Sequence, residues 1–395
     1  MSRSELASEV SAWLYRETGK RFDLDPHLVA KWERGAVRLP TAAYRSALRA
    51  VLGANSDADL GFSDAPTATE TAEPSPTGVP ETPGGGYFQN SQGPWVGVEY
   101  VDSLRSAVGQ FVKLEALLGG GDIVASVIRR FRDAQRVLGE GRYLPQVERD
   151  LEAAAAELGE LAGWMLHDAE RHDEARQINA EALMLARVAG DLKMEWFILS
   201  NQALSSTHAG RDREALRISD RMIETDPPAR VRALFDVRRA RALGHLGDGA
   251  AALKAFDRAK ATFAEGVTSR DPEWSWWFGE EVVNAHTGLL HVSLGEHGRA
   301  LPYLAAAAEG ASKATNYQWG ILIHRANLLD GLLRAGDSAE AERVALATVP
   351  LVGQVNSGGA EGVLRRAATR EAGKPWPSTL SDVLEHMWRR PAPCG

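Results

Sequence analysis

The segment LVAKWERGAVRLP, residues 28–40, carries basic and polar side chains at helical spacing. His27, Lys31 and Arg34 are three or four residues apart, so a helix would present them on one face. Arginine can donate two parallel hydrogen bonds to a guanine edge, and a small apolar side chain can contact a thymine methyl. The side chains that we predict to contact DNA bases are His27, Leu28, Ala30, Lys31 and Arg34.

Further basic residues flank this segment and could bind phosphate oxygens, which fix register rather than read sequence. They are Lys20, Arg21, Arg38 and Arg45. Residues 1–53 have a net charge of +3, whereas the whole chain has a net charge of −8. A nucleic-acid partner is therefore expected for the N-terminal part alone. The alternative is that these charges belong to an ordinary solvated surface.

Three short helices are predicted to position these side chains, over residues 2–15, 25–35 and 40–53. In the middle helix Asp25 suits the N-cap, Pro26 the first helical position and Gly35 the C-cap. Val29 and Trp32 are expected to face the core. The apolar stripes of the outer two helices consist of Leu6, Val10, Trp13 and Leu14, and of Tyr44, Leu48 and Leu52.

This pattern resembles the Xre-type helix-turn-helix family, in the version found in large actinobacterial regulators. The matching residues are Ser2, Glu5, Leu6, Ala7, Val29, Ala30, Glu33, Gly35, Pro40, Leu48, Leu52 and Gly53, followed by SDADLGF at 56–62. The resemblance implies a helix that enters the major groove of operator DNA, in a dimer that contacts two half-sites.

Members of that family normally have one more helix before the first helix of this pattern, and residue 1 leaves no room for it. The resemblance implies that Glu33 would pair with a basic residue on that helix. Two hypotheses therefore stay open. The chain is a DNA-binding regulator, or it is a protein-interaction scaffold whose helix-turn-helix has lost its DNA-binding role.

Residues 63–94 are rich in Pro, Thr, Gly and Glu and have no apolar periodicity, which is typical of a flexible linker. We therefore predict a DNA-binding domain over 1–62 and a helical domain over 95–395. The triple glycine at 119–121 lacks the Gly-Lys-Ser/Thr of a phosphate loop, so it is interpreted as a turn between helices.

Several function classes have no support in the sequence. No stretch approaches 20 apolar residues, no signal-peptide pattern is present, and Cys394 is the only cysteine. These features predict a cytoplasmic protein without a membrane partner. Common hydrolase, metalloprotease and nucleotide-binding motifs are missing, and the ten histidines are scattered. We expect no catalysis, no cofactor and no metal.

The region after about residue 145 repeats. Five polar breaks align so that an alanine recurs every 37 to 48 residues, at Ala175, Ala215, Ala252, Ala300 and Ala341. Glycine stands five residues before each alanine except the first, where Glu170 replaces it. Glycine suits a helix end because it adopts positive φ at little cost. Residues 149–355 resemble the tetratricopeptide repeat, which implies stacked helix pairs. A generic α-solenoid is the alternative.

In the tetratricopeptide repeat the first helices of successive pairs line a concave face that binds ligands. Its contact positions correspond here to Trp164, His167, Asn201, His208, Arg238, Arg241, His245, His286, Asn327, Asp330 and Arg334. The amides of Asn201 and Asn327 could donate to and accept from a peptide backbone. The alternative is a surface that serves dimerisation. The aromatic cluster at 274–277 is expected to be a packing wedge rather than a ligand lid.

Together these patterns predict an all-α protein in which a helix-turn-helix domain is tethered by a flexible linker to an α-solenoid. The expected partners are double-stranded operator DNA and, on the repeats, a peptide, a small signal or another protein. A homodimer is expected because one motif offers too few base contacts for a specific site.

Overall fold

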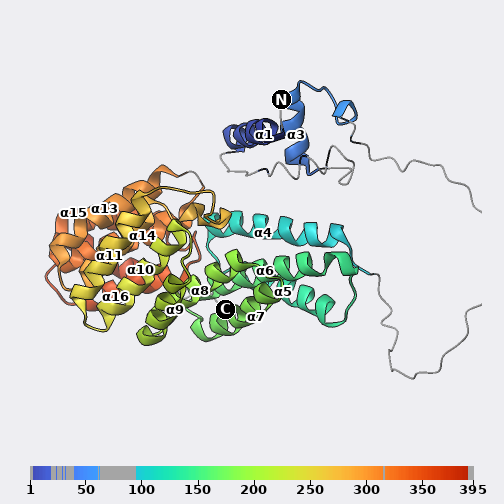
Figure 1. Ribbon diagram of the computed structural model, residues 1–395. Helices are drawn as coiled ribbons and strands as arrows, with labels where there is room; N and C mark the ends of the chain where they lie inside the picture. The colour runs from blue at the N-terminus through green and yellow to red at the C-terminus, as the bar shows by residue number, and fades with distance from the viewer. Residues whose placement is uncertain are drawn as a thin grey trace, which may run out of the picture. The chain divides into compact units, whose positions relative to one another are not determined.

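The computed structural model describes residues 3–18, 24, 29, 32, 40–60, 62, 95–314 and 316–389. Two compact units make up the chain, residues 1–88 and 89–395 (Figure 1). Within the described residues the secondary structure consists of helices, short 3-10 turns and two isolated β-bridges, so the all-α prediction is confirmed there. The segment predicted as a linker, 63–94, lies outside the described residues.

The N-terminal unit has an apolar core of its own. Helix α1 (Arg3–Thr18) packs against α3 (Ala42–Leu52), which ends at Gly53 in the left-handed conformation. Val29 and Trp32 are helical and buried, as their spacing predicted. The core residues are Ala7, Val10, Leu14, Leu24, Val29, Trp32, Ala47 and Leu48.

The prediction that Leu52 faces this core is wrong, because its side chain is 46% exposed. Val51 packs against the core instead. Tyr44, Leu48 and Val51 follow the i, i+4, i+7 spacing of one helix face, and Leu52 lies a further 100° around the helix in its last turn.

Consecutive helix pairs form the second unit, as the repeats predicted. The pairs are α6 (Glu148–Asp168) with α7 (His172–Val188), α8 (Leu192–His208) with α9 (Asp212–Glu224), α10 (Ala229–His245) with α11 (Gly249–Ala264), α12 (Glu280–Ser293) with α13 (His297–Lys313), and α14 (Gln318–Ala335) with α15 (Ser338–Thr348). Two helices precede them, α4 (Val98–Leu118) and α5 (Val124–Gly139), and two follow, α16 (Gly358–Glu371) and α17 (Ser378–Arg389).

Small residues occupy the places where the two helices of a pair cross. The five aligned alanines are fully buried. A Cβ atom on Gly163 would lie 2.1 Å from Asn179 Oδ1, and one on Gly288 would lie 2.6 Å from Leu304 Cγ, so no larger residue fits without movement. At the helix end that lacks glycine, Glu170 itself adopts φ +58°.

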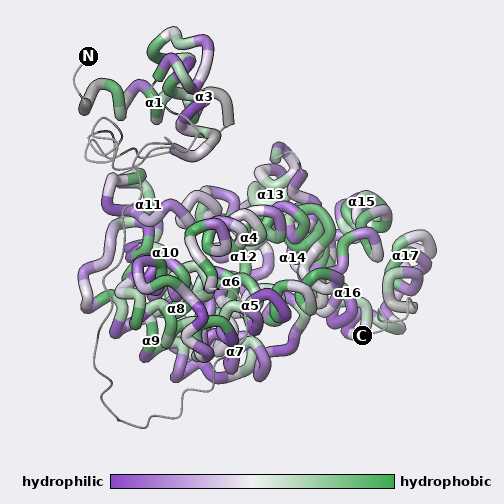
Figure 2. Tube along the Cα trace, turned by 90° about the vertical axis from the view of Figure 1, so that its right-hand side faces the viewer, coloured by the Kyte–Doolittle hydropathy of each residue, from purple (hydrophilic) through white to green (hydrophobic). Residues whose placement is uncertain are grey.

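The first helix of each pair lies on the inner side of the stack. The first helices form a series, α6, α8, α10, α12 and α14, in which each helix before α14 contacts the next one, whereas successive second helices contact each other less. The hydropathy colouring shows hydrophilic and hydrophobic residues mixed along these helices (Figure 2). Side chains on the inner helices are therefore brought together from several repeats.

The beginning and the end of the repeat unit contact each other. Helix α4 packs against α14, and α6 packs against α16 (Figure 1). The backbone N–H of Asn356 donates to Leu118 O at 2.7 Å, and Gly121 N–H donates to Asn356 O at 3.1 Å. A Cβ atom on Gly119 would lie 2.3 Å from Asn356 O. The triple glycine at 119–121 is thus a turn between helices, and it is also the place where the C-terminal part of the unit packs against the beginning of the unit.

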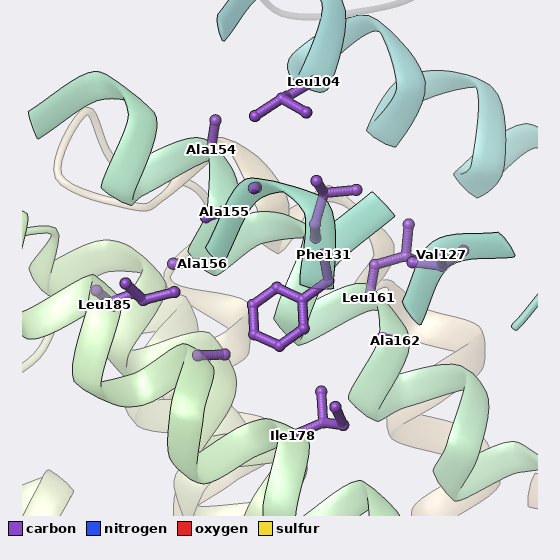
Figure 3. Close-up of a cluster of buried hydrophobic side chains, with 14 of the residues drawn as sticks. Leu104, Val127, Phe131, Ala154, Ala155, Ala156, Leu161, Ala162, Ile178 and Leu185 are labelled. Carbon is purple, nitrogen blue, oxygen red and sulfur yellow. The ribbon is translucent and has the colours of Figure 1, made fainter. Parts of the chain in front are cut away.

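An apolar cluster at the start of the unit holds α4 to α7 together. Figure 3 shows the Phe131 ring of α5 among Ala155, Leu161 and Ile178. Gly159 makes room for this ring, because a Cβ atom there would lie 2.8 Å from Phe131 Cε2. Close packing of this kind fixes the position of α6, from which several inner side chains project.

Among the described residues, no helix combines the length and the apolar character needed to cross a bilayer.

Candidate functional site

The inner helices bring most of the predicted repeat-domain contacts onto one surface. We call this surface the inner face and define it by Trp164, His167, Asn201, His208, Arg238, Arg241, His286, His324 and Asn327. Three groups of side chains lie on this face or directly beside it: an acidic and aromatic group around Trp164, a histidine column and an arginine pair.

The acidic and aromatic group joins the two ends of the repeat unit. Trp164 Nε1 of α6 donates to Glu115 Oε1 of α4 at 3.0 Å. Trp319 Nε1 of α14 donates to Asp168 Oδ1 at 3.0 Å, and the Ser357 hydroxyl donates to the same oxygen at 2.7 Å. The two indole rings meet edge to face, with centroids 5.4 Å apart. Trp164 is therefore part of the closure as well as of the inner face.

Burial raises the pKa of the carboxyl groups in this region. The pKa of Glu115 rises to about 7, that of Asp168 to about 6 and that of Glu160 to about 8. Asn201 Nδ2 donates to Glu160 Oε1 at 2.6 Å, which ties α8 to α6. A peptide backbone that used Asn201 as a clamp would have to compete with this bond.

The histidine column begins at the end of α6. The His167 and His208 rings stack with centroids 4.8 Å apart, and His167 Nδ1 is 3.0 Å from Ser205 Oγ. Burial, followed by nearby positive charge, lowers the pKa of His167 to about 3 and that of His208 well below its usual value. Both rings are neutral at pH 7. His208 retains an exposed surface, so solvent reaches this part of the inner face.

The arginine pair projects from α10. Arg238 and Arg241 are only 2% and 8% exposed. Arg238 Nη1 lies 3.2 Å from His286 Nε2, and Arg241 Nη1 lies 3.3 Å from His286 Nδ1. A guanidinium only donates hydrogen bonds, and a neutral imidazole has a single accepting nitrogen. His286 can therefore accept from only one of the two arginines at a time.

One further nitrogen of each guanidinium is buried without a hydrogen-bond partner among the described residues. The buried Nε atoms of Arg238 and Arg241 make no hydrogen bond within the described part of the chain, and neither arginine forms an ion pair there. Burial lowers the pKa of Arg238 to about 9 and that of Arg241 to about 10, so both stay charged at pH 7. The nearby carboxylate of Asp212 interacts instead with His245 Nδ1, at 3.1 Å.

The other predicted repeat-domain residues have different surroundings. Asp330 forms ion pairs with Arg334 at 2.8 Å and with Arg370 at 2.7 Å. Asp330 and Arg334, both predicted as ligand contacts, therefore pair within the unit. Asn327 is buried, and its amide makes no hydrogen bond to another described side chain.

Of the predicted DNA contacts, Arg45 alone falls within the described residues. Its Nε donates to Asp57 Oδ2 at 2.8 Å and its Nη1 donates to Pro40 O at 2.6 Å, so this side chain holds the N-terminal unit together. The remaining ones lie outside the described residues: Lys20, Arg21, His27, Leu28, Ala30, Lys31, Arg34 and Arg38.

The aromatic cluster at 274–277 packs against α8, as the wedge hypothesis predicted for two of its three tryptophans. Trp274 stacks on Phe197 with centroids 4.4 Å apart, and its Nε1 donates to Lys193 O at 2.9 Å. Trp277 also stacks on Phe197. Trp276 is 72% exposed and does not share in this packing.

Sequence reasoning missed several inner polar residues. Asp168 has the same place in its repeat as His208 and His245, so its register could have identified it. Glu115 lies before the repeats, and Glu160 and His324 lie at positions that the repeat family does not use for contacts. Only the packed structure brings these residues to the inner face.

The described residues contain no group of three or more His, Cys, Asp or Glu side chains arranged to hold a metal ion. No family model matches the chain, and no curated protein is similar enough to it to count as a relative. Its class therefore follows from fold and site alone. It is an all-helical repeat protein whose inner face carries buried, unpaired charge.

Proposed function

We propose that this protein is a DNA-binding regulator whose repeat unit binds a ligand on its inner face. The observation that carries the DNA-binding half is the burial of Val29 and Trp32 in the core of the N-terminal unit. These residues anchor one side of the segment that resembles a recognition helix, and we propose that the opposite side of that helix meets DNA.

Helical geometry then identifies the side chains that would meet DNA. Successive residues are 100° apart around a helix, and the core direction lies midway between Val29 and Trp32. A continuous helix through this segment would place His27, Lys31 and Arg34 within about 50° of the opposite direction. These are polar or basic residues suited to base edges and phosphates in a major groove.

The arginine pair supports the ligand-binding half. A buried charge without a partner lowers the stability of a folded protein, and apolar residues of similar volume often serve equally well. Retaining two such charges on one helix is understandable if a ligand supplies the missing counter-charge. Ligand binding would then shift the arrangement of two DNA-binding units in a homodimer.

The test measures binding of the full chain to DNA from the region upstream of its own gene, by fluorescence anisotropy at several salt concentrations. Affinity should fall steeply as salt rises, because phosphate contacts release counterions. Lys31→Ala and Arg34→Ala should each weaken binding by roughly tenfold or more. Arg343→Ala, which removes the same charge from the exposed side of α15, is the matched control.

Two outcomes would contradict the proposal. Equal affinities for Lys31→Ala, Arg34→Ala and the control would show that the segment does not contact DNA. No binding at low salt, with the N-terminal unit folded by circular dichroism, would favour the scaffold hypothesis.

A further inference from the structure

The charge of the arginine pair restricts the chemistry of its ligand. Arg238 and Arg241 contribute two positive charges at a nearly buried point of the inner face, and no carboxylate in the described part of the chain forms an ion pair with either. A single carboxylate would neutralise only half of this charge. A phosphate monoester carries close to two negative charges at neutral pH and offers three acceptor oxygens.

The unused hydrogen-bond donors also fit such a group. The buried Nε of each arginine lacks an acceptor, and only one of the two Nη1 atoms can use His286 at a time. A guanidinium binds phosphate through two parallel N–H donors, which a point charge cannot do. We propose that Arg238 and Arg241 together bind the terminal phosphate monoester of a ligand on the inner face.

The surrounding histidines add donors without adding charge. Burial and the two arginines keep the pKa of His286 well below its usual value, and burial lowers the pKa of His324 to about 4. His324 Nδ1 is buried and has no hydrogen-bond partner among the described residues. Neutral imidazoles of this kind can donate to phosphate oxygens while the arginines supply the counter-charge.

A neighbouring arginine on the same helix does form an ion pair with a carboxylate. Arg239, between the two members of the pair in sequence, forms an ion pair with Asp220 on α9. Its side chain faces the outer helix, where acids are present. Arg239 thus has a carboxylate partner, whereas Arg238 and Arg241 form no ion pair with any described residue.

This inference rests on the proposed ligand binding by the repeat unit, and it does not depend on DNA binding. The experiment uses the full chain and two measurements, the Tm and the heat of titration. The probes are inorganic phosphate, glucose 6-phosphate and a phosphoserine tripeptide, with succinate and chloride at equal ionic strength as comparisons. The two phosphorylated compounds separate a small metabolite from a peptide as the source of the phosphate group.

Wild-type protein should gain Tm as phosphate rises, and one phosphorylated compound should bind more tightly than phosphate alone. Arg238→Met and Arg241→Met should each reduce its affinity by roughly tenfold to a hundredfold, because each removes charge-assisted hydrogen bonds. Without ligand these variants should unfold at a higher temperature than wild type, since an unpaired buried charge is gone. Arg239→Met should bind like wild type.

Arg241→Lys guards against a variant that fails to fold. It keeps the charge but loses the fork of donors, so it should lose less affinity than Arg241→Met. The proposal is overturned if phosphate compounds raise Tm no more than chloride, if succinate alone raises it, or if Arg239→Met loses as much affinity as Arg241→Met. DNA binding is measured separately, so failure of one proposal is distinguishable from failure of the other.

Discussion

Arginine side chains on the outer helices of the repeat unit and those on the inner helix α10 differ in whether they form ion pairs. On the outer helix α7, Arg176 pairs with Glu214 of α9 at 2.7 Å, and Asp173 pairs at 2.7 Å with Arg211, which directly precedes α9. On the inner helix α10, Arg238 and Arg241 are buried and form no ion pair with a carboxylate of the described residues. These exposed charges are paired, whereas the two buried arginines form no ion pair with a described residue.

Stability alone would favour the reverse arrangement. An exposed ion pair contributes about 0–1 kcal/mol, because water already solvates both groups. A buried charge without a partner is strongly unfavourable. The outer pairs are therefore expected to matter little for stability, whereas the inner polar groups should determine how the unit responds to mutation and to pH.

The largest effect is expected at Asp168, where the two ends of the unit meet. Asp168→Ala removes the acceptor for Trp319 Nε1 and for the Ser357 hydroxyl, which would leave two donors unsatisfied. We expect a loss of about 2–4 kcal/mol in the free energy of unfolding, measured by urea denaturation. The control is Asp173→Ala on the outer helix, which should change it by less than about 0.5 kcal/mol. Equal losses in the two variants would refute the comparison.

The buried carboxyl groups of Glu160 and Glu115, which lie beside the inner face, should limit the stability of the fold at high pH. The pKa of Glu160 is raised from 4.5 to about 8 and that of Glu115 to about 7 by burial. Their contribution is fully present below pH 4.5 and is lost as pH rises through 7 to 8. Glu160→Gln keeps an acceptor for Asn201 and cannot ionise. It should raise the stability by about 1–2 kcal/mol at pH 8.5 and change it little at pH 5.

The inner histidines impose the opposite limit at low pH. Burial lowers the pKa of His167 from 6.5 to about 3 and that of His324 to about 4. Their contribution is present above pH 6.5 and is lost as pH falls below it. A thermal scan of wild-type protein should therefore show its highest Tm between pH 4.5 and 6.5. A Tm that rises steadily from pH 6.5 to 9 would contradict the high-pH limit, and a Tm that rises as pH falls below 4.5 would contradict the low-pH limit.

A smaller effect tests whether exposed ion pairs contribute little to the free energy of unfolding. Glu170 adopts φ +58° and forms an ion pair with Arg366 at 3.0 Å. Glu170→Gly removes the strained conformation and the ion pair together. We expect a net gain of about 0.5 kcal/mol by urea denaturation, because the backbone relief exceeds the loss of a largely exposed pair. A net loss would mean that outer ion pairs stabilise the fold more than the comparison allows.

The smallest effect is expected for the outer pair itself. A double-mutant cycle with Arg176→Ala and Glu214→Ala should give a coupling energy below about 0.5 kcal/mol at physiological salt. The coupling should shrink further in 1 M salt, because the ions screen it. A coupling above 1 kcal/mol that is insensitive to salt would be the contrary result.

Much of the fold could be predicted from the sequence because its signals are local. The spacing of Ala175 and its four equivalents, and the glycines before them, reflect the close crossing of paired helices and the left-handed turn that ends each first helix. Val29 and Trp32 followed from periodicity in the same way. Leu52 did not, since a helix can end with its last turn beyond the core.

The site was less accessible to sequence reasoning, because its neighbours are distant in the chain. Register placed Trp164 and His167 on the inner helices, yet nothing local relates Trp164 to Glu115 or Asn201 to Glu160. The same holds for Asp168, whose partners Trp319 and Ser357 lie more than 150 residues away and are reached only when the unit closes.

By itself, the sequence determined an all-helical chain, the register of its helix pairs and the side of each helix that faces inward. These depend on residue size, glycine conformation and apolar spacing within a few turns. Only the tertiary structure decided that the two ends of the repeat unit meet at Gly119 and Asp168, and that Arg238 and Arg241 are left without a counter-charge. Burial and pairing depend on what the rest of the chain places around a side chain, and no local pattern encodes that.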